Sequence, residues 1–124
     1  MPKTLILFAG DDPAGAEAIA EGARSVRFAE VDVLPIDPPP DPTSYDALVV
    51  DAALPDVGLL GGAPLADKVA SAFGGDDAAR WGTLRSLAAQ GCLIVPPAED
   101  ARAHGRRVAT VAGWIHHARS HHQH

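Results

Sequence analysis

Short apolar runs along this chain alternate with longer segments whose apolar residues follow helical spacing. Residues 4–9 and 45–52 are mostly apolar, which is typical of central parallel strands buried on both faces. Residues 29–36 alternate apolar and polar side chains, which predicts a strand nearer the edge of a sheet. Residues 92–97 predict another buried strand that ends at two prolines.

The pattern at residues 68–73 fits two interpretations. The run is short and apolar, as in a central strand, but Leu65, Val69 and Phe73 also have helical spacing. The connector at residues 37–44 contains four prolines and cannot be helical. The segment 52–67 is rich in glycine and proline and predicts a loop.

Three helices are expected. The first runs from the Asp12-Pro13 pair to about residue 26, with Asp12 as N-cap and Pro13 at the first helical position. The second is capped by Asp76 or Asp77 and ends before Gly91. The third spans about residues 99–120 and closes the fold.

Strands separated by crossover connections predict an α/β domain with a parallel sheet and helices on its faces. We expect a three-layer α/β/α sandwich with five parallel strands in the order 2-1-3-4-5. Residues 1–120 form one domain in this interpretation, and residues 121–124 form a His-rich tail.

Composition narrows the classes of partner and compartment. The 124 residues carry a net charge of −6, which argues against nucleic acid or an anionic membrane as the main partner. The acidic residues gather early, whereas residues 101–124 contain four Arg, all six His and no carboxylate. The single Cys92 fits a reducing compartment, and no apolar run approaches membrane-spanning length. We therefore expect a cytoplasmic protein.

Four stretches of the chain resemble the flavodoxin superfamily, most closely its flavin-dependent NAD(P)H:quinone reductase branch (the tryptophan-repressor-binding-protein-like proteins). The resemblance implies a flavodoxin-like fold with FMN at the loops after the strands, and it favours residues 68–73 as the fourth strand. The stretches are AEAIAEGA (16–23), YDALVV (45–50), LADKVASAFGG (65–75) with TLRSLAAQGCLIVPP (83–97), and ARAHGRRVATVAGWI (101–115).

The FMN loops that this resemblance implies are reduced. The first loop is GDDPAG, which is shorter than in the family, has no hydroxyl side chain and places two carboxylates where a phosphate would sit. Trp81 could stack on a flavin or pack against the sheet. We expect no cofactor, with FMN as the alternative. If FMN binds, the resemblance implies these cofactor-binding residues: Gly10, Asp11, Asp12, Ala53, Leu54, Gly74, Gly75 and Trp81.

Groups of Asp and His side chains suggest metal binding or phosphoryl transfer as further possibilities. Asp11, Asp12 and Asp51 could converge on Mg²⁺ at the sheet edge, as in receiver domains, but the last strand lacks the Lys that such domains need. His117 and His121 have the spacing of a chelating pair, although a polar tail explains them as well. His104 is expected on the exposed side of the last helix, and Cys92 in the core.

The thin connectors predict an exposed apolar face on one side of the sheet. Such a face usually marks an interface. We expect it to include four residues of the third loop, which follows the third strand: Leu54, Val57, Leu59 and Leu60. The leading hypothesis is a non-catalytic structural or interaction subunit with a protein partner or a second copy. The alternatives are a minimal FMN-dependent NAD(P)H:quinone oxidoreductase and a receiver-like signalling domain.

Overall fold

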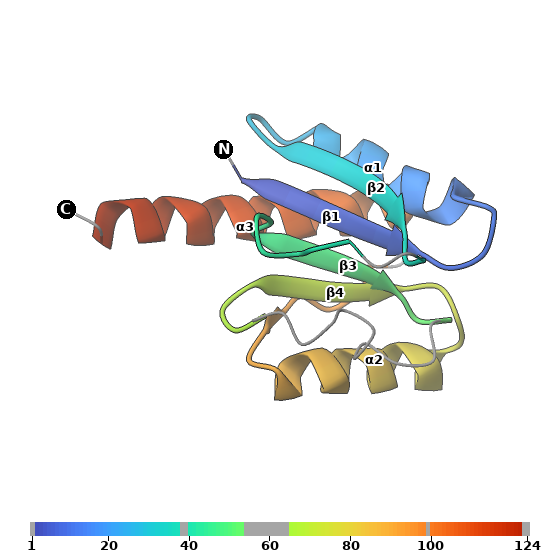
Figure 1. Cartoon of the computed structure of the whole chain (residues 1–124). Coiled ribbons are helices and arrows are strands. Elements are labelled where there is room, and N and C mark those ends of the chain that lie inside the picture. The colour runs from blue at the N-terminus through green and yellow to red at the C-terminus, as the bar shows by residue number, and fades with distance from the viewer. Residues whose placement is uncertain (1, 38–39, 54–64, 99, 123–124) are drawn as a thin grey trace.

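A five-stranded parallel sheet forms the centre of the protein in a computed structural model, which describes residues 2–37, 40–53, 65–98 and 100–122. The strand order is β2-β1-β3-β4-β5, as the sequence predicts (Figure 1). The elements in chain order are β1 (Lys3–Phe8), α1 (Ala14–Arg24), β2 (Glu30–Pro35), β3 (Ala47–Asp51), β4 (Val69–Phe73), α2 (Asp77–Ala89), β5 (Leu93–Ile94) and α3 (Ala101–His122).

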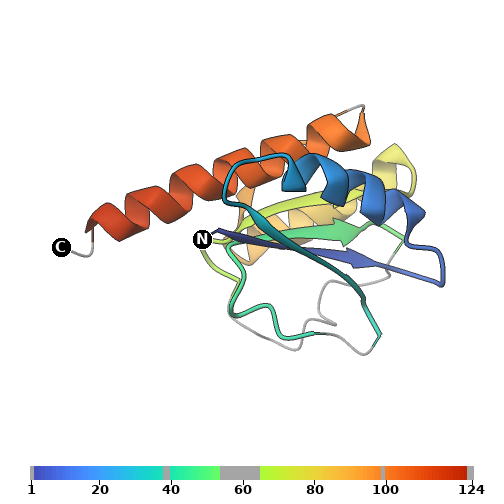
Figure 2. The same cartoon turned by 90° about the horizontal axis from the view of Figure 1, so that it is seen from above.

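The helices cover the two faces of the sheet unequally. Helices α1 and α3 lie together on one face of the sheet (Figure 2). On that face, Ile19 and Val108 belong to the same buried cluster as Ile6 of β1. Helix α2 packs on the other face, where Leu87 joins the cluster that contains Leu5 and Leu7. Because successive side chains of a strand point to opposite faces, β1 contributes to both cores.

The expected exposure of the sheet under thin connectors is not observed. Leu5, Leu7, Leu48 and Val50 are all fully buried on the face where α2 packs. These four strand side chains are therefore not part of an exposed apolar face.

The interpretation of residues 68–73 as a strand is confirmed, and the helical interpretation is wrong. Residues Val69–Phe73 pair with β3 along their whole length and with β5 at Val69 and Ala70. The last strand is shorter than predicted, with only Leu93 and Ile94 assigned to it. Pro96 and Pro97, which have no N–H group, follow soon after and cannot extend the ladder as donors.

Acidic side chains begin the first two helices. The Asp76 carboxylate accepts the Ala79 N–H at 2.8 Å, so Asp76 rather than Asp77 caps α2. Pro13 stands at the N-cap position of α1, one residue later than the sequence suggests. The Asp12 carboxylate still accepts the N–H of Ala14, the first helical residue, at 3.0 Å. Both carboxylates satisfy N–H groups that have no partner within their helix.

Two glycines let α1 and α3 cross closely. A Cβ atom on Gly22 would overlap the backbone carbonyl of Arg102, and one on Gly105 would overlap that of Ile19. Glycine is therefore required at both positions by backbone contact rather than by torsion angle. None of the helices in the described ranges is long and apolar enough to cross a membrane.

Candidate functional site at the carboxyl edge of the sheet

The loops after β1, β3 and β4 meet at the carboxyl edge of the sheet, and Asp51 joins them. One carboxylate oxygen of Asp51 accepts the Ala9 N–H at 3.0 Å, and the other accepts the Ala53 N–H at 2.9 Å. The Ala52 N–H donates to the Phe73 carbonyl at 2.7 Å, which ties the third loop to the end of β4. Ligands of open parallel sheets bind at this edge.

Glycines in the left-handed region shape two of these loops. Gly10 has φ +78°, and Gly74 and Gly75 have φ +71° and +61°. A Cβ atom on Gly74 would lie 2.9 Å from Oδ1 of Asp51, so the backbone approaches this carboxylate closely. Turns of this kind expose backbone groups to a ligand without intervening side chains.

A cavity of about 520 Å³ opens beside the end of β4. Its wall combines the start of α1, the end of β4, the first turns of α2 and the start of α3, with Gly15, Phe73, Gly74, Arg80, Trp81 and His104 among the lining residues. Trp81 is 59% exposed, so the interpretation in which it packs against the sheet is wrong. Its indole is available to a ligand in the cavity.

Arg80 braces the loop that follows β4. Its guanidinium donates to the carbonyls of Gly74 and Gly75, at 3.1 and 2.8 Å, and forms an ion pair with Asp77. These contacts fix the two positive-φ glycines against the first turn of α2. The loop beside the cavity is therefore held by a side chain that also lines it.

His104 lies at the cavity wall in a buried hydrogen-bonded pair with Ser71, which corrects its expected exposure. It is only 2% exposed, and its Nε2 is 2.6 Å from Oγ of Ser71. Oγ is also 2.6 Å from the carbonyl oxygen of Val95, which can only accept. The single hydroxyl proton must go to Val95, so Nε2 carries a proton and donates to Ser71, and Nδ1 is the unprotonated nitrogen.

Burial keeps this imidazole neutral. Loss of solvent and, to a smaller extent, the charge of Arg107 lower the pKa of His104 to about 4. Sequence reasoning missed this residue, although its position offers a signal: Ala101, His104 and Val108 have the spacing of one inward helical stripe. A polar residue on such a stripe needs a partner, which here comes from β4.

The predicted magnesium and receiver sites gain no support. No group of three or more His, Cys, Asp or Glu side chains that could hold a metal occurs in the part of the chain that the structure describes. Asp51 uses both carboxylate oxygens on backbone N–H groups, and Asp12 binds the start of α1. Asp11 is exposed and belongs to no such group among the described residues.

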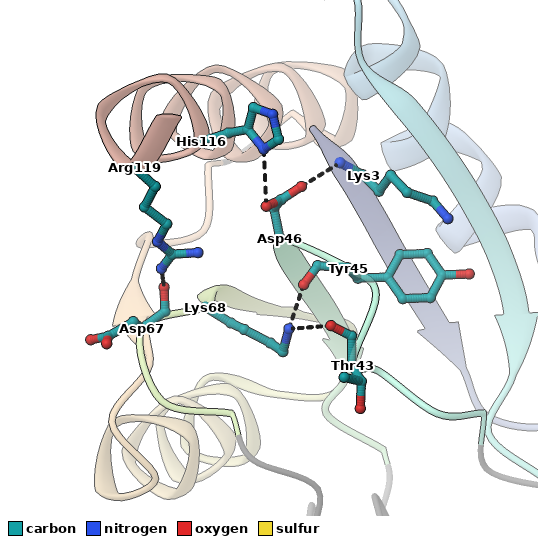
Figure 3. Close-up of polar contacts among 8 residues, drawn as sticks. All are labelled: Lys3, Thr43, Tyr45, Asp46, Asp67, Lys68, His116 and Arg119. Atoms are coloured by element: carbon teal, nitrogen blue, oxygen red, sulfur yellow. Dashed lines mark hydrogen bonds and ion pairs between the residues drawn. The ribbon is translucent and has the colours of Figure 1, made fainter. Parts of the chain in front are cut away.

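A second polar cluster lies at the opposite, amino edge of the sheet (Figure 3). The Asp46 carboxylate accepts the Lys3 N–H at 2.9 Å and pairs with Nδ1 of His116 on α3 at 3.3 Å. The Lys68 ammonium donates to the carbonyls of Thr43 and Tyr45, and burial lowers the pKa of this ammonium group. These contacts fasten the connector before β3 to α3 and β4, which is a structural role.

Two remaining predictions have different outcomes. Cys92 is buried, with Sγ 3.4 Å from the Leu65 carbonyl, and burial raises the pKa of its thiol, as expected for an inert core cysteine. The predicted interface residues Leu54, Val57, Leu59 and Leu60 lie outside the described residues, so that interface stays a prediction.

Comparison with known proteins identifies the fold. No protein-family model matches the sequence, and no curated protein matches it. Solved structures do match, and flavodoxins are among them. One from the domain Archaea is 16% identical, with 91% of this chain and 98% of that chain covered and a TM-score of 0.71.

Two bacterial flavodoxins agree with this result. The two-electron reduced Megasphaera elsdenii flavodoxin is 15% identical, covers 87% of this chain and 98% of its own, and has a TM-score of 0.70. The oxidised flavodoxin 2 from Bacillus cereus is 20% identical, covers 90% of this chain and 97% of its own, and has a TM-score of 0.54. The chain therefore has a flavodoxin-like α/β fold.

The expectation that this domain has no cofactor is contradicted by these neighbours. The neighbours that share this fold are flavodoxins, and two of them were solved in a reduced and an oxidised state. The expectation rested mainly on the acidic loop after β1. The cavity beside β4 and Trp81 is a separate feature of the same edge.

Proposed function

We propose that this domain binds a flavin at the carboxyl edge of β1, β3 and β4 and acts as a redox protein. The observation that carries the proposal is the cavity of about 520 Å³ beside the glycine turn after β4, with the exposed indole of Trp81 on its wall. The flavodoxin-like fold supports the same ligand class.

The residues at this cavity suit a flat, mostly apolar ring. Trp81 and Phe73 offer aromatic surface, and the neutral His104 adds an imidazole that burial keeps uncharged. The backbone of Gly74 and Gly75, braced by Arg80, offers polar groups without side chains in the way. A bound flavin would supply one- or two-electron transfer, and these residues would position its ring and exclude water.

The finer form of the proposal is a minimal NAD(P)H:quinone oxidoreductase. Purified protein saturated with flavin is mixed with NADH or NADPH and a soluble quinone, and the nucleotide absorbance is followed. Turnover that Trp81→Ala lowers supports the reductase. Flavin binding without turnover leaves an electron carrier as the function, because such a protein needs a protein donor instead.

We propose a structural or interaction role only as a second candidate. Trp114 on α3 is 68% exposed, and exposed tryptophans are enriched at interfaces. Figure 1 shows that this helix continues beyond the amino edge of the sheet. Light scattering at increasing protein concentration tests self-association, with Trp114→Ser as the variant expected to abolish it and a strictly monomeric protein as the contrary result.

A further inference from the structure

The start of α1 does not fit a phosphate dianion, although it lies at the edge where the flavin is proposed to bind. The Asp12 carboxylate accepts the N–H of Ala14 at 3.0 Å and so occupies the first backbone donor of the helix. A helix N-terminus attracts anions through such donors and through its dipole. Here the protein's own carboxylate takes that place.

The charge around this turn points the same way. Asp11 and Asp12 are both exposed on the loop, and Glu17 follows in the first turn of the helix. Residues 9–23 contain no Lys, Arg or His and no Ser or Thr. The nearest basic side chain along the helix, Arg24, pairs with Glu17 at 3.4 Å. A phosphate would meet like charges without a cation or hydroxyl from this segment to offset them.

The cavity beside β4 is not subject to this conflict. Its lining is largely apolar and aromatic, and Asp77, the acid that lines it, is paired with Arg80. The ring of a flavin and its phosphate therefore meet two different environments at one edge of the sheet. The cavity beside β4 is compatible with binding of the ring, and the acidic turn before α1 opposes binding of the phosphate.

We infer, on the basis of the proposed flavin-binding function, that the domain selects a flavin without a phosphate, so that riboflavin binds more tightly than FMN. The carboxylates of Asp11 and Asp12 act as the selecting groups by repelling the phosphate. Neither side chain lines the cavity proposed for the ring, so removing both charges should change the affinity for FMN and leave the affinity for riboflavin unchanged.

The test is a pair of titrations of the whole chain, with riboflavin and with FMN, followed by quenching of flavin fluorescence. Wild type should bind riboflavin about tenfold more tightly than FMN at low salt, and salt should narrow the gap because it screens the repulsion. The double variant Asp11→Asn/Asp12→Asn keeps an acceptor for the helix start and removes both charges. It should tighten FMN binding about tenfold and shift riboflavin binding less than twofold.

Glu30→Gln is the matched control, since Glu30 is an exposed acid at the start of β2, away from this edge. It should leave the preference unchanged. Tighter binding of FMN than of riboflavin to wild type would overturn this inference and support the proposed function. A double variant that keeps the wild-type preference for riboflavin would have the same two consequences. Absence of saturable binding of either flavin would overturn both.

Discussion

Nε2 of His104 lies 2.6 Å from Oγ of Ser71, and both side chains are buried between α3 and β4. The Ser71 hydroxyl donates a hydrogen bond to the Val95 carbonyl at 2.6 Å, so hydrogen bonds run from α3 through β4 to the segment after β5. The pair thus joins the last helix to the sheet beneath the cavity wall. It also makes stability depend on pH.

Folding favours the neutral form of His104. Because burial lowers its pKa from 6.5 to about 4, the unfolded chain binds more protons than the folded one between these values. Stability should therefore fall as the pH drops from 6.5 towards 4, by up to about 3 kcal/mol from this residue alone. Other groups titrate in the same range, so the residue must be isolated by a variant.

The variant His104→Gln keeps a donor for Ser71 but does not titrate. We expect it to be less stable than wild type at pH 7, with a difference in the free energy of unfolding that shrinks as the pH approaches 4. Urea unfolding at several pH values measures this difference. A difference that stays constant from pH 7 to pH 4.5 would show that His104 is not held neutral by burial.

The contact between α1 and α3 predicts a contrast between glycines. Gly22→Ala and Gly105→Ala should each destabilise the protein by about 2 kcal/mol or more, because the new Cβ would overlap a backbone carbonyl of the facing helix. Gly82→Ala is the matched control, since Gly82 is helical and has no neighbouring atom within 4 Å. It should stabilise α2 by up to about 1 kcal/mol. Thermal unfolding that ranks all three variants equally would refute the close crossing.

Asp51 should be the acid at the carboxyl edge whose loss is most costly. Asp51→Ala leaves the N–H groups of Ala9 and Ala53 without their acceptor, which we expect to cost about 2–4 kcal/mol. Asp51→Asn retains one acceptor oxygen and should lose less. Chemical denaturation compares the two variants. Loss of less than about 0.5 kcal/mol in Asp51→Ala would mean that this carboxylate does not hold the loops together.

The sequence predicted the centre of the sheet well because the strands at residues 4–9 and 45–52 are continuous apolar runs. The segment 45–52 could hardly be anything but a central strand, and its neighbours in order followed from the crossovers. His104 could not be placed in the same way. Its partner Ser71 is 33 residues away and lies on a strand whose identity was itself ambiguous.

The site was predicted less completely than the fold for a related reason. The sequence shows the adjacent acids Asp11 and Asp12, but it does not show the cavity against β4 and α2. The cavity arises from helix starts that are far apart in the chain, at Gly15, Trp81 and Ala101. Only their arrangement in space separates the environment of a flavin ring from that of its phosphate.

Visible absorbance of the flavin-loaded protein tests the central claim, that the cavity beside Trp81 receives a flavin ring. Wild type is incubated with riboflavin, freed of excess ligand by gel filtration, and scanned next to Trp81→Ala and the control Trp114→Ala, which removes an exposed indole far from the cavity. The account predicts that flavin bands elute with wild type and with Trp114→Ala. The affinity of Trp81→Ala for riboflavin should be at least about tenfold weaker, so its flavin bands should be much smaller. A colourless wild-type protein, or equal flavin binding by all three, would contradict it.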